Sequence, residues 1–345
     1  MKTDILVIGA GPVGLFTVFE AGILGLKCTL IDNLDKPGGQ CAELYPDKPI
    51  FDIPGVPYQT AQEHVDALLK QIEPFEYDLM LNERVDSVTK KGDIWKVTTN
   101  KGSTVETPNI FIAAGAGSFE PIKPNLERDF SSMEGKKIFY SIKDKTIFKD
   151  KNVVIFGGGD SALDWTVELD KVGAKVTLIH RRNAFRGAPD TEMAVRKLSD
   201  TQKIKLLTPF IIKDISGDEN IDSIKLLNTD SKDEIDIGAD YILFFYGLNK
   251  KLGPIIDWNL ELSGKKIQVN TENFETDKEG IFAVGDINTY PGKLNLILSG
   301  FHETTLAVQK AFSRVYPGER IPFGYTTSSK QIHEKLGYSE KQQAK

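Results

Sequence analysis

Two segments of the chain share one order of apolar and polar positions. The first has a mostly apolar run at 4–8, a glycine-rich turn at 9–14, a helical pattern to about Leu26 and a second apolar run at 28–31. Short runs without polar interruption are typical of parallel strands buried on both faces. The pattern therefore predicts strand, turn, helix and strand in succession.

The same order returns in the middle of the chain. Apolar runs at 152–156 and 175–179 enclose a glycine-rich turn at 157–162 and a helical pattern at 164–172. The distance from the first glycine to the residue after the second strand is 23 positions in both copies. Two matched β-α-β units at one spacing are more specific than a single glycine motif, and they predict an α/β protein with two Rossmann-like units.

Both turns have the residue types that a dinucleotide pyrophosphate requires. The first glycine allows a tight turn, the second lets backbone approach the phosphates, and a small third residue lets helix and strand pack closely. The start of the following helix then offers free N–H groups to the anion. A structural turn without ligand is the alternative for each copy. The candidate phosphate-binding residues are Gly9, Gly11, Pro12 and Gly14 in the first copy, and Gly157, Gly159, Asp160 and Ser161 in the second.

The two units differ where their second strands end. The first strand ends at Asp32, whose carboxylate can accept hydrogen bonds from a ribose diol. The second unit has no acidic residue there, and guanidinium groups bind a 2′-phosphate through charge-assisted hydrogen bonds. The first unit is therefore expected to bind a dinucleotide without that phosphate, and the second NADP(H), unless the cations form an ordinary surface cluster. The candidate NADP-binding residues after the second strand of the second unit are His180, Arg181, Arg182 and Arg186.

A third pattern near the C-terminus completes the first unit. A short apolar strand within 278–286 ends in Gly285-Asp286, and a helical pattern runs from about Asn295 to Phe312. An aspartate at this position can bind a sugar-alcohol hydroxyl. The helix N-terminus favours negative charge beside it.

Composition excludes several classes of protein. The 345 residues have a net charge of −6, which argues against a nucleic-acid partner. No apolar run reaches the roughly 20 residues of a membrane-spanning helix, and the N-terminus does not resemble a signal peptide. Two cysteines, Cys28 and Cys41, form neither a disulfide framework nor a zinc-ligand pattern. We therefore expect a cytoplasmic protein that has no metal site and does not bind membranes.

The motifs together resemble the FAD-dependent pyridine nucleotide-disulfide oxidoreductases of the low-molecular-weight thioredoxin reductase type. The resemblance covers residues 3–330 and rests on both glycine turns, Gly38-Gly39-Gln40, the arginine segment and Gly285-Asp286. It implies an FAD domain in two parts, 1–116 and 247–345, with an NADP domain at 117–246 inserted between them.

One departure from that family decides the expected activity. Segment 139–145, where thioredoxin reductases have a C-x-x-C dithiol, contains no cysteine. Cys41 follows Gly38-Gly39-Gln40 as in the larger disulfide reductases, but Pro46 stands at the position of their second cysteine. Electrons must therefore leave the flavin for an external acceptor. The chain is then most similar to the thioredoxin-reductase-like ferredoxin–NADP⁺ reductases of bacteria.

This resemblance implies a homodimer that exchanges a hydride between NADP(H) and FAD, and single electrons with ferredoxin or flavodoxin. Such chemistry needs aligned cofactors rather than a catalytic acid or base, so no catalytic side chain is expected. In the C-terminal segment, where the family has a histidine or another aromatic over the flavin, this chain offers Tyr325. By motif position the FAD contacts fall on Asp32, Gln40, Tyr45, Val85, Phe119, Asp286 and Thr327.

Several alternatives remain open from the sequence. The protein could be an NADPH-dependent disulfide or quinone reductase, or a non-catalytic flavoprotein that senses NADP. Segment 136–151 contains six lysines and two aspartates, and it could steer an acidic carrier or form an ordinary solvated face. His64, in a predicted helix at 60–75, is expected to be exposed.

Overall fold

The computed structural model describes residues 1–321 and 326–335. It divides into two compact units, and the second interrupts the first in sequence. Unit 1 comprises Met1–Ser118 and Lys250–Lys345, and unit 2 comprises Phe119–Asn249. The boundaries expected after residues 116 and 246 lie two and three positions before these divisions.

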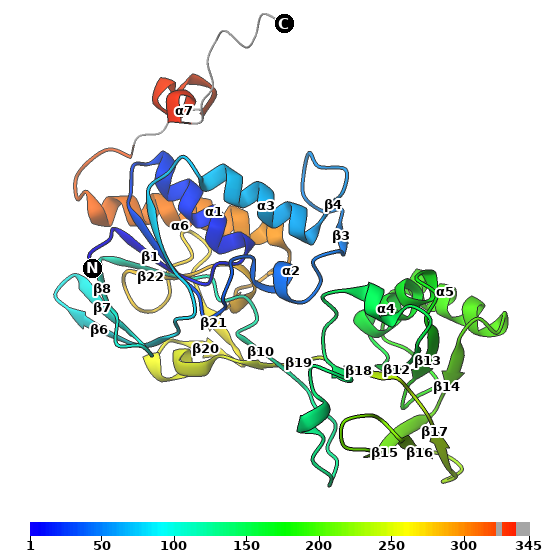
Figure 1. The fold of residues 1–345 in the computed structure, drawn as a ribbon. Coiled ribbons are helices and arrows are strands. Elements are labelled where there is room, and N and C mark those ends of the chain that lie inside the picture. The colour runs from blue at the N-terminus through cyan, green and yellow to red at the C-terminus, as the bar shows by residue number, and fades with distance from the viewer. Residues whose placement is uncertain (322–325, 336–345) are drawn as a thin grey trace, which may run out of the picture. The chain divides into compact units, whose positions relative to one another are not determined.

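Unit 1 is built on a five-stranded parallel sheet (Figure 1). β1 lies at its centre, with β2 on one side and β9 on the other. The strand order is β5-β2-β1-β9-β22, with bounds Tyr77–Met80, Cys28–Ile31, Ile5–Ile8, Asn109–Ile112 and Ile281–Ala283. β1 and β2 are the two apolar runs that the sequence predicts as strands.

Alternate side chains of β1 enter two different cores, which explains why this strand is apolar throughout. Ile5 and Val7 pack with the helices, while Leu6 and Ile8 pack with an antiparallel meander. Unit 1 therefore has three layers, and Figure 1 shows its helices side by side. These elements are α1 (Pro12–Ile23), α3 (Ala61–Ile72) and α6 (Ile297–Val315), and β6 (Val85–Lys91), β7 (Ile94–Thr99) and β8 (Thr104–Thr107).

Unit 2 repeats this plan. Its parallel sheet has the order β14-β13-β12-β18-β11, again with the first strand of the β-α-β unit at the centre. Val153 and Ile155 face the helices, whereas Val154 and Phe156 face a second antiparallel meander. The strands of this sheet are β14 (Lys205–Leu207), β13 (Lys175–Ile179), β12 (Asn152–Gly157), β18 (Tyr241–Phe245) and β11 (Ile138–Phe139). The helices are α4 (Asp160–Lys171) and α5 (Pro189–Asp200), and the meander is β15 (Phe210–Ser216), β16 (Ser223–Asn228) and β17 (Glu234–Ile237).

The repeated architecture confirms the expected fold class, α/β with two Rossmann-like units. Within the described residues no helix is long and apolar enough to cross a membrane. The other elements are α2 (Gly39–Glu43), α7 (Lys330–Lys335), β3 (Pro49–Ile50), β4 (Gln59–Thr60), β10 (Ser118–Pro121), β19 (Leu248–Lys251), β20 (Leu262–Ser263), β21 (Lys266–Gln268), β23 (Asn288–Thr289), and five 3₁₀ turns, η1 (Ser131–Met133), η2 (Lys145–Phe148), η3 (Gly253–Trp258), η4 (Gly285–Ile287) and η5 (Thr326–Ser328).

Candidate cofactor-binding sites

The first glycine turn leaves no room for a side chain at Gly9 or at Gly14. Gly9 has a φ of +109°, and a Cβ added there would lie 2.4 Å from the Ala113 carbonyl oxygen. A Cβ on Gly14 would lie 1.8 Å from the Gly9 carbonyl oxygen. Pro12 occupies the first turn of α1, whose N-terminus has no side-chain cap. The first amides of α1 therefore have no side-chain acceptor, as an anion-binding helix end requires.

A second backbone loop lies against this turn. The Gly38 N–H donates to the Ala10 carbonyl over 2.8 Å. Gly39 has a φ of +54°, and its Cβ position is 3.0 Å from the Gly11 Cα. Two glycine loops thus form a cradle lined by backbone, and this cradle fits the pyrophosphate of a dinucleotide.

Asp32 stands directly beside the turn, at the end of β2. Its carboxylate accepts the Ala10 N–H over 2.6 Å and the Leu34 N–H over 2.8 Å. Burial raises the pKa of this carboxyl, and the backbone N–H donors oppose that rise. The backbone donors are Ala10, Asn33 and Leu34, and a carboxylate has about four lone-pair positions, so at least one position remains for a further donor. The geometry therefore fits the ribose-binding role predicted for Asp32.

Three more predicted residues gather at the same edge of the sheet. A hydrogen bond joins the side chains of Tyr45 and Cys41, and the Asp286 carboxylate is close enough to raise the pKa of both groups. The Gln40 amide nitrogen lies 3.3 Å from the Cβ position of Gly115, just after β9. Segments far apart in sequence thus bring Gln40, Tyr45 and Asp286 to the carboxyl ends of the parallel strands, where α/β folds bind ligands.

The remaining predicted FAD residues are less informative. Val85 is buried in the meander core, 4% exposed, so only its backbone is available to a ligand. Phe119 lies on β10, and its side chain is outside what the structure describes. Thr327 is exposed on η5. Tyr325 lies outside the described residues.

The second glycine turn in unit 2 has the same design. A Cβ on Gly157 would lie 2.7 Å from the Phe245 carbonyl oxygen, whereas Gly159 faces open space. Asp160 and Ser161 are exposed at the start of α4, which has no side-chain cap. The Asp160 carboxylate accepts the Ala188 N–H over 2.8 Å and so holds the start of α5 near the turn.

A ring stack that the sequence analysis missed supports the basic loop after β13. The ring of His180 lies against Gly158, whose Cβ position is 2.3 Å from its Cε1. His180 stacks on Phe185, with ring centroids 5.3 Å apart, and the Arg196 guanidinium lies 5.3 Å from the Phe185 centroid. Burial and the nearby arginines lower the pKa of His180. His180 is therefore neutral near pH 7 and acts as a packing group.

The three arginines of this loop are free to bind an anion. Arg181, Arg182 and Arg186 are all exposed. Among residues 1–321 and 326–335, none of the three forms an ion pair with a carboxylate. Exposed guanidinium groups beside a glycine turn, with no carboxylate ion-paired to them in the described part of the chain, fit a 2′-phosphate.

Neither cysteine is placed for thiol chemistry. Cys28 and Cys41 are unpaired and no more than 2% exposed. Burial raises the pKa of the Cys41 thiol to about 11, so the reactive thiolate is rare at neutral pH. A redox dithiol is therefore absent from the described part of the chain, which contains both cysteines.

The lysine-rich segment of unit 2 is partly engaged within the unit. Lys145 pairs with Glu168 over 3.0 Å, and Lys137 lies over the ring of Tyr241. Lys149 and Lys151 are exposed. A docking role for this segment stays a prediction.

Comparison with known proteins identifies the family. A family model described as pyridine nucleotide-disulphide oxidoreductase matches residues 3–311. A ferredoxin–NADP reductase of Pelagibacter ubique is 52% identical over 337 residues, covering 98% of this chain and 99% of the relative. A ferredoxin–NADP reductase of Flavobacterium johnsoniae is 51% identical over 331 residues, covering 95% and 94%.

Solved structures agree on the fold. The chain superimposes on the thioredoxin reductase of Lactococcus lactis with a TM-score of 0.74 at 24% identity, over 91% of this chain and 99% of the other. The thioredoxin reductase of T. acidophilum gives a TM-score of 0.76 at 20% identity, with the same coverage. The family expected from the motifs is confirmed: the chain belongs to the pyridine nucleotide-disulphide oxidoreductases.

Proposed function

We propose that this protein is a ferredoxin–NADP⁺ reductase that uses FAD and exchanges electrons between NADP(H) and ferredoxin or flavodoxin. The observation that carries the proposal is the pairing of two dinucleotide cradles with different charges. The first ends in a carboxylate at Asp32, and the second ends in exposed arginines. The lack of a reactive dithiol directs electrons to an external acceptor. The relatives that are about half identical over nearly the whole chain have the same name.

The residues of unit 1 bind and orient FAD in this proposal. Backbone amides of the two glycine loops bind the pyrophosphate, Asp32 accepts the ribose hydroxyls, and Asp286 accepts a sugar-alcohol hydroxyl. Tyr45 stacks on the flavin ring in this proposal. Bound FAD supplies the conversion between two-electron and one-electron transfer.

The residues of unit 2 select NADP(H). The amides at the start of α4 bind the pyrophosphate, and the guanidinium groups of Arg181, Arg182 and Arg186 bind the 2′-phosphate. His180 and Phe185 hold this loop in place by stacking. No proton transfer by a side chain is needed, since orientation of the two cofactors suffices for hydride transfer.

The partner and the assembly complete the proposal. Ferredoxins and flavodoxins are acidic, and the exposed Lys149 and Lys151 could steer them electrostatically. The resemblance implies a homodimer, and two buried, unpaired cysteines suit a reducing cytoplasm. Sedimentation equilibrium of the purified protein tests the dimer.

An acceptor comparison tests the proposed function. The FAD-loaded protein is supplied with NADPH and, separately, with ferredoxin, flavodoxin, thioredoxin and a quinone. We expect fast reduction of ferredoxin or flavodoxin, and an NADH rate well below the NADPH rate. Equal rates with thioredoxin or the quinone would favour a disulfide or quinone reductase, and a flavin that NADPH does not reduce would favour an NADP sensor.

A further inference from the structure

The turn that presents Asp286 is packed without spare volume. Gly285, the residue before it, has a φ of +81°. Its Cβ position is 3.3 Å from a methyl carbon of Val13 in α1. Gly300 in α6 also lies against this turn, because a Cβ there would lie 3.2 Å from the Gly285 Cα. A side chain at either glycine would therefore meet Val13 of α1.

A buried ion pair holds both polar groups of the Gly285 backbone. The Gly285 N–H donates to Glu303 Oε2 over 2.7 Å, and the Lys293 ammonium donates to the Gly285 carbonyl over 2.9 Å. Lys293 also forms an ion pair with Glu303 Oε1. The side chains of Lys293 and Glu303 are 4% and 0% exposed. The N–H and the carbonyl of Gly285 are thus both hydrogen-bonded to the Lys293–Glu303 ion pair.

Two further donors complete the hydrogen bonding of the Glu303 carboxylate. The Tyr290 hydroxyl donates to Glu303 Oε1 over 2.9 Å, and the Asn288 amide donates to Oε2 over 2.8 Å. Each oxygen of Glu303 therefore accepts two hydrogen bonds. A buried charge is costly unless its partners satisfy it fully, and the four donors that satisfy Glu303 favour one conformation of the backbone around it.

We propose that Lys293 and Glu303 are positioning residues for FAD: they hold the Gly285 peptide and so aim the Asp286 carboxylate at the sugar-alcohol chain of the cofactor. This inference rests on the proposed function. It assigns a role to two residues that lie 7 and 17 positions after Asp286 and act through the turn.

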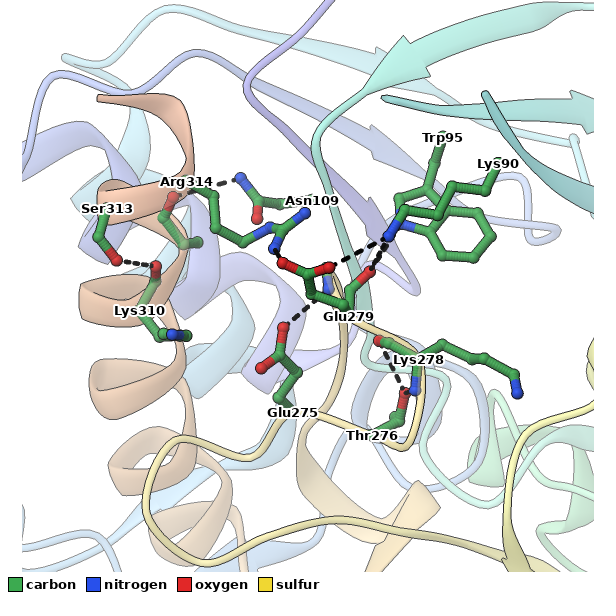
Figure 2. A network of polar contacts seen from close by, with 12 residues as sticks. Lys90, Trp95, Asn109, Glu275, Thr276, Lys278, Glu279, Lys310, Ser313 and Arg314 are labelled. Atoms are coloured by element: carbon green, nitrogen blue, oxygen red, sulfur yellow. Dashed lines mark hydrogen bonds and ion pairs between the residues drawn. The ribbon is translucent and has the colours of Figure 1, made fainter. Parts of the chain in front are cut away.

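A second ion-pair network at the opposite end of β22 provides a matched control (Figure 2). Glu279 pairs with Arg314 over 2.5 Å and with Lys90 over 3.4 Å, and its carbonyl accepts the Trp95 indole N–H. The side chain of Glu279 is 65% exposed. This network anchors the start of the strand that ends at the Gly285 turn, so it shares the strand but does not touch the turn.

The test compares FAD binding by Glu303→Gln and Glu279→Gln in the full-length protein. Both variants replace a carboxylate by an amide in an ion pair. FAD is titrated into deflavinated protein, and the flavin absorption spectrum and midpoint potential of each complex are measured. We expect Glu303→Gln to raise the Kd for FAD at least about tenfold and to change the spectrum, because it leaves Lys293 buried without its counter-charge. Glu279→Gln should stay within about twofold of the natural protein.

Coupling to Asp286 distinguishes positioning from general destabilisation. If Glu303 acts through Asp286, Glu303→Gln will weaken FAD binding much less in an Asp286→Ala background than in the natural one. Should Glu303→Gln not fold, Tyr290→Phe removes one donor to Glu303, and we expect it to weaken FAD binding about threefold.

Three results would overturn the inference. The first is a Glu303→Gln variant, or a Tyr290→Phe variant if Glu303→Gln does not fold, that binds FAD with the affinity and spectrum of the natural protein. The second is a Glu279→Gln variant whose FAD binding is weakened as much as that of Glu303→Gln. The third is full additivity of the effects of Glu303→Gln and Asp286→Ala on FAD binding. The natural protein is titrated first. If it binds no FAD, the proposed function fails, whereas natural binding with unaffected variants refutes the positioning role alone.

Discussion

Replacement of Arg181 and Arg182 by alanine tests the assignment of the second cradle. Each guanidinium is exposed and lacks a carboxylate partner among the described residues, so its loss leaves no unpaired buried charge. Protein stability should therefore change by less than about 0.5 kcal/mol. A hydrogen bond to a charged group contributes about 1.5–3 kcal/mol, and exposure favours the low end.

The size of the effect follows from that value. About 1.5 kcal/mol per arginine corresponds to about tenfold weaker NADPH binding for each single variant, and somewhat less than 100-fold for the pair, because adjacent residues are not independent. NADH lacks the 2′-phosphate, so its binding should change less than about twofold.

Steady-state kinetics with NADPH and NADH measure this difference directly. Arg128→Ala is the matched control, since this exposed arginine lies in the same unit but pairs with Asp218 over 2.8 Å. We expect the control to bind both nucleotides like the natural protein. An equal loss of NADPH and NADH activity in the double variant would refute the 2′-phosphate assignment.

Three further changes have defined outcomes. Gly14→Ala places a Cβ 1.8 Å from the Gly9 carbonyl oxygen, so thermal unfolding should show a loss of about 3 kcal/mol and FAD titration a weaker complex; natural stability would contradict the tight turn. Gly158→Ala displaces the His180 ring, and NADPH titration should show about tenfold weaker binding with FAD affinity unchanged, whereas parallel losses would refute the separation of the sites. Burial raises the pKa of Glu20 from 4.5 to about 7; the folded state holds this proton more tightly, so the free energy of unfolding should fall by about 3 kcal/mol between about pH 4.5 and 7. Glu20→Gln should remove this fall in denaturant titrations, and an unchanged pH dependence would contradict it.

The architecture was predictable because its signals are local. The apolar runs around Ile5 and Val153 reflect strands buried on both faces, and the glycine-rich turns at 9–14 and 157–162 directly follow those strands within one β-α-β unit. Helix ends differ from the prediction: α4 begins at Asp160 rather than Asp164, and α6 extends to Val315 rather than Phe312.

The polar groups that depend on distant partners were not predictable. Glu303 looks like one polar residue of an amphipathic helix, and its donors come from Gly285, Asn288, Tyr290 and Lys293, which only the fold brings together. The expectation for His64 was wrong. It is 4% exposed because α3 turns it toward Gln59, whose amide lies 2.7 Å from its Nδ1, and toward the ring of Phe301.

In the proposed function, electrons pass from NADPH through FAD to a protein carrier without a thiol relay. The most direct test uses the Cys28→Ala/Cys41→Ala variant, loaded with FAD and mixed anaerobically with NADPH and then ferredoxin. We expect the flavin to be bleached and ferredoxin to be reduced at rates within about twofold of the natural protein. A folded, FAD-loaded variant that no longer reduces ferredoxin would contradict it.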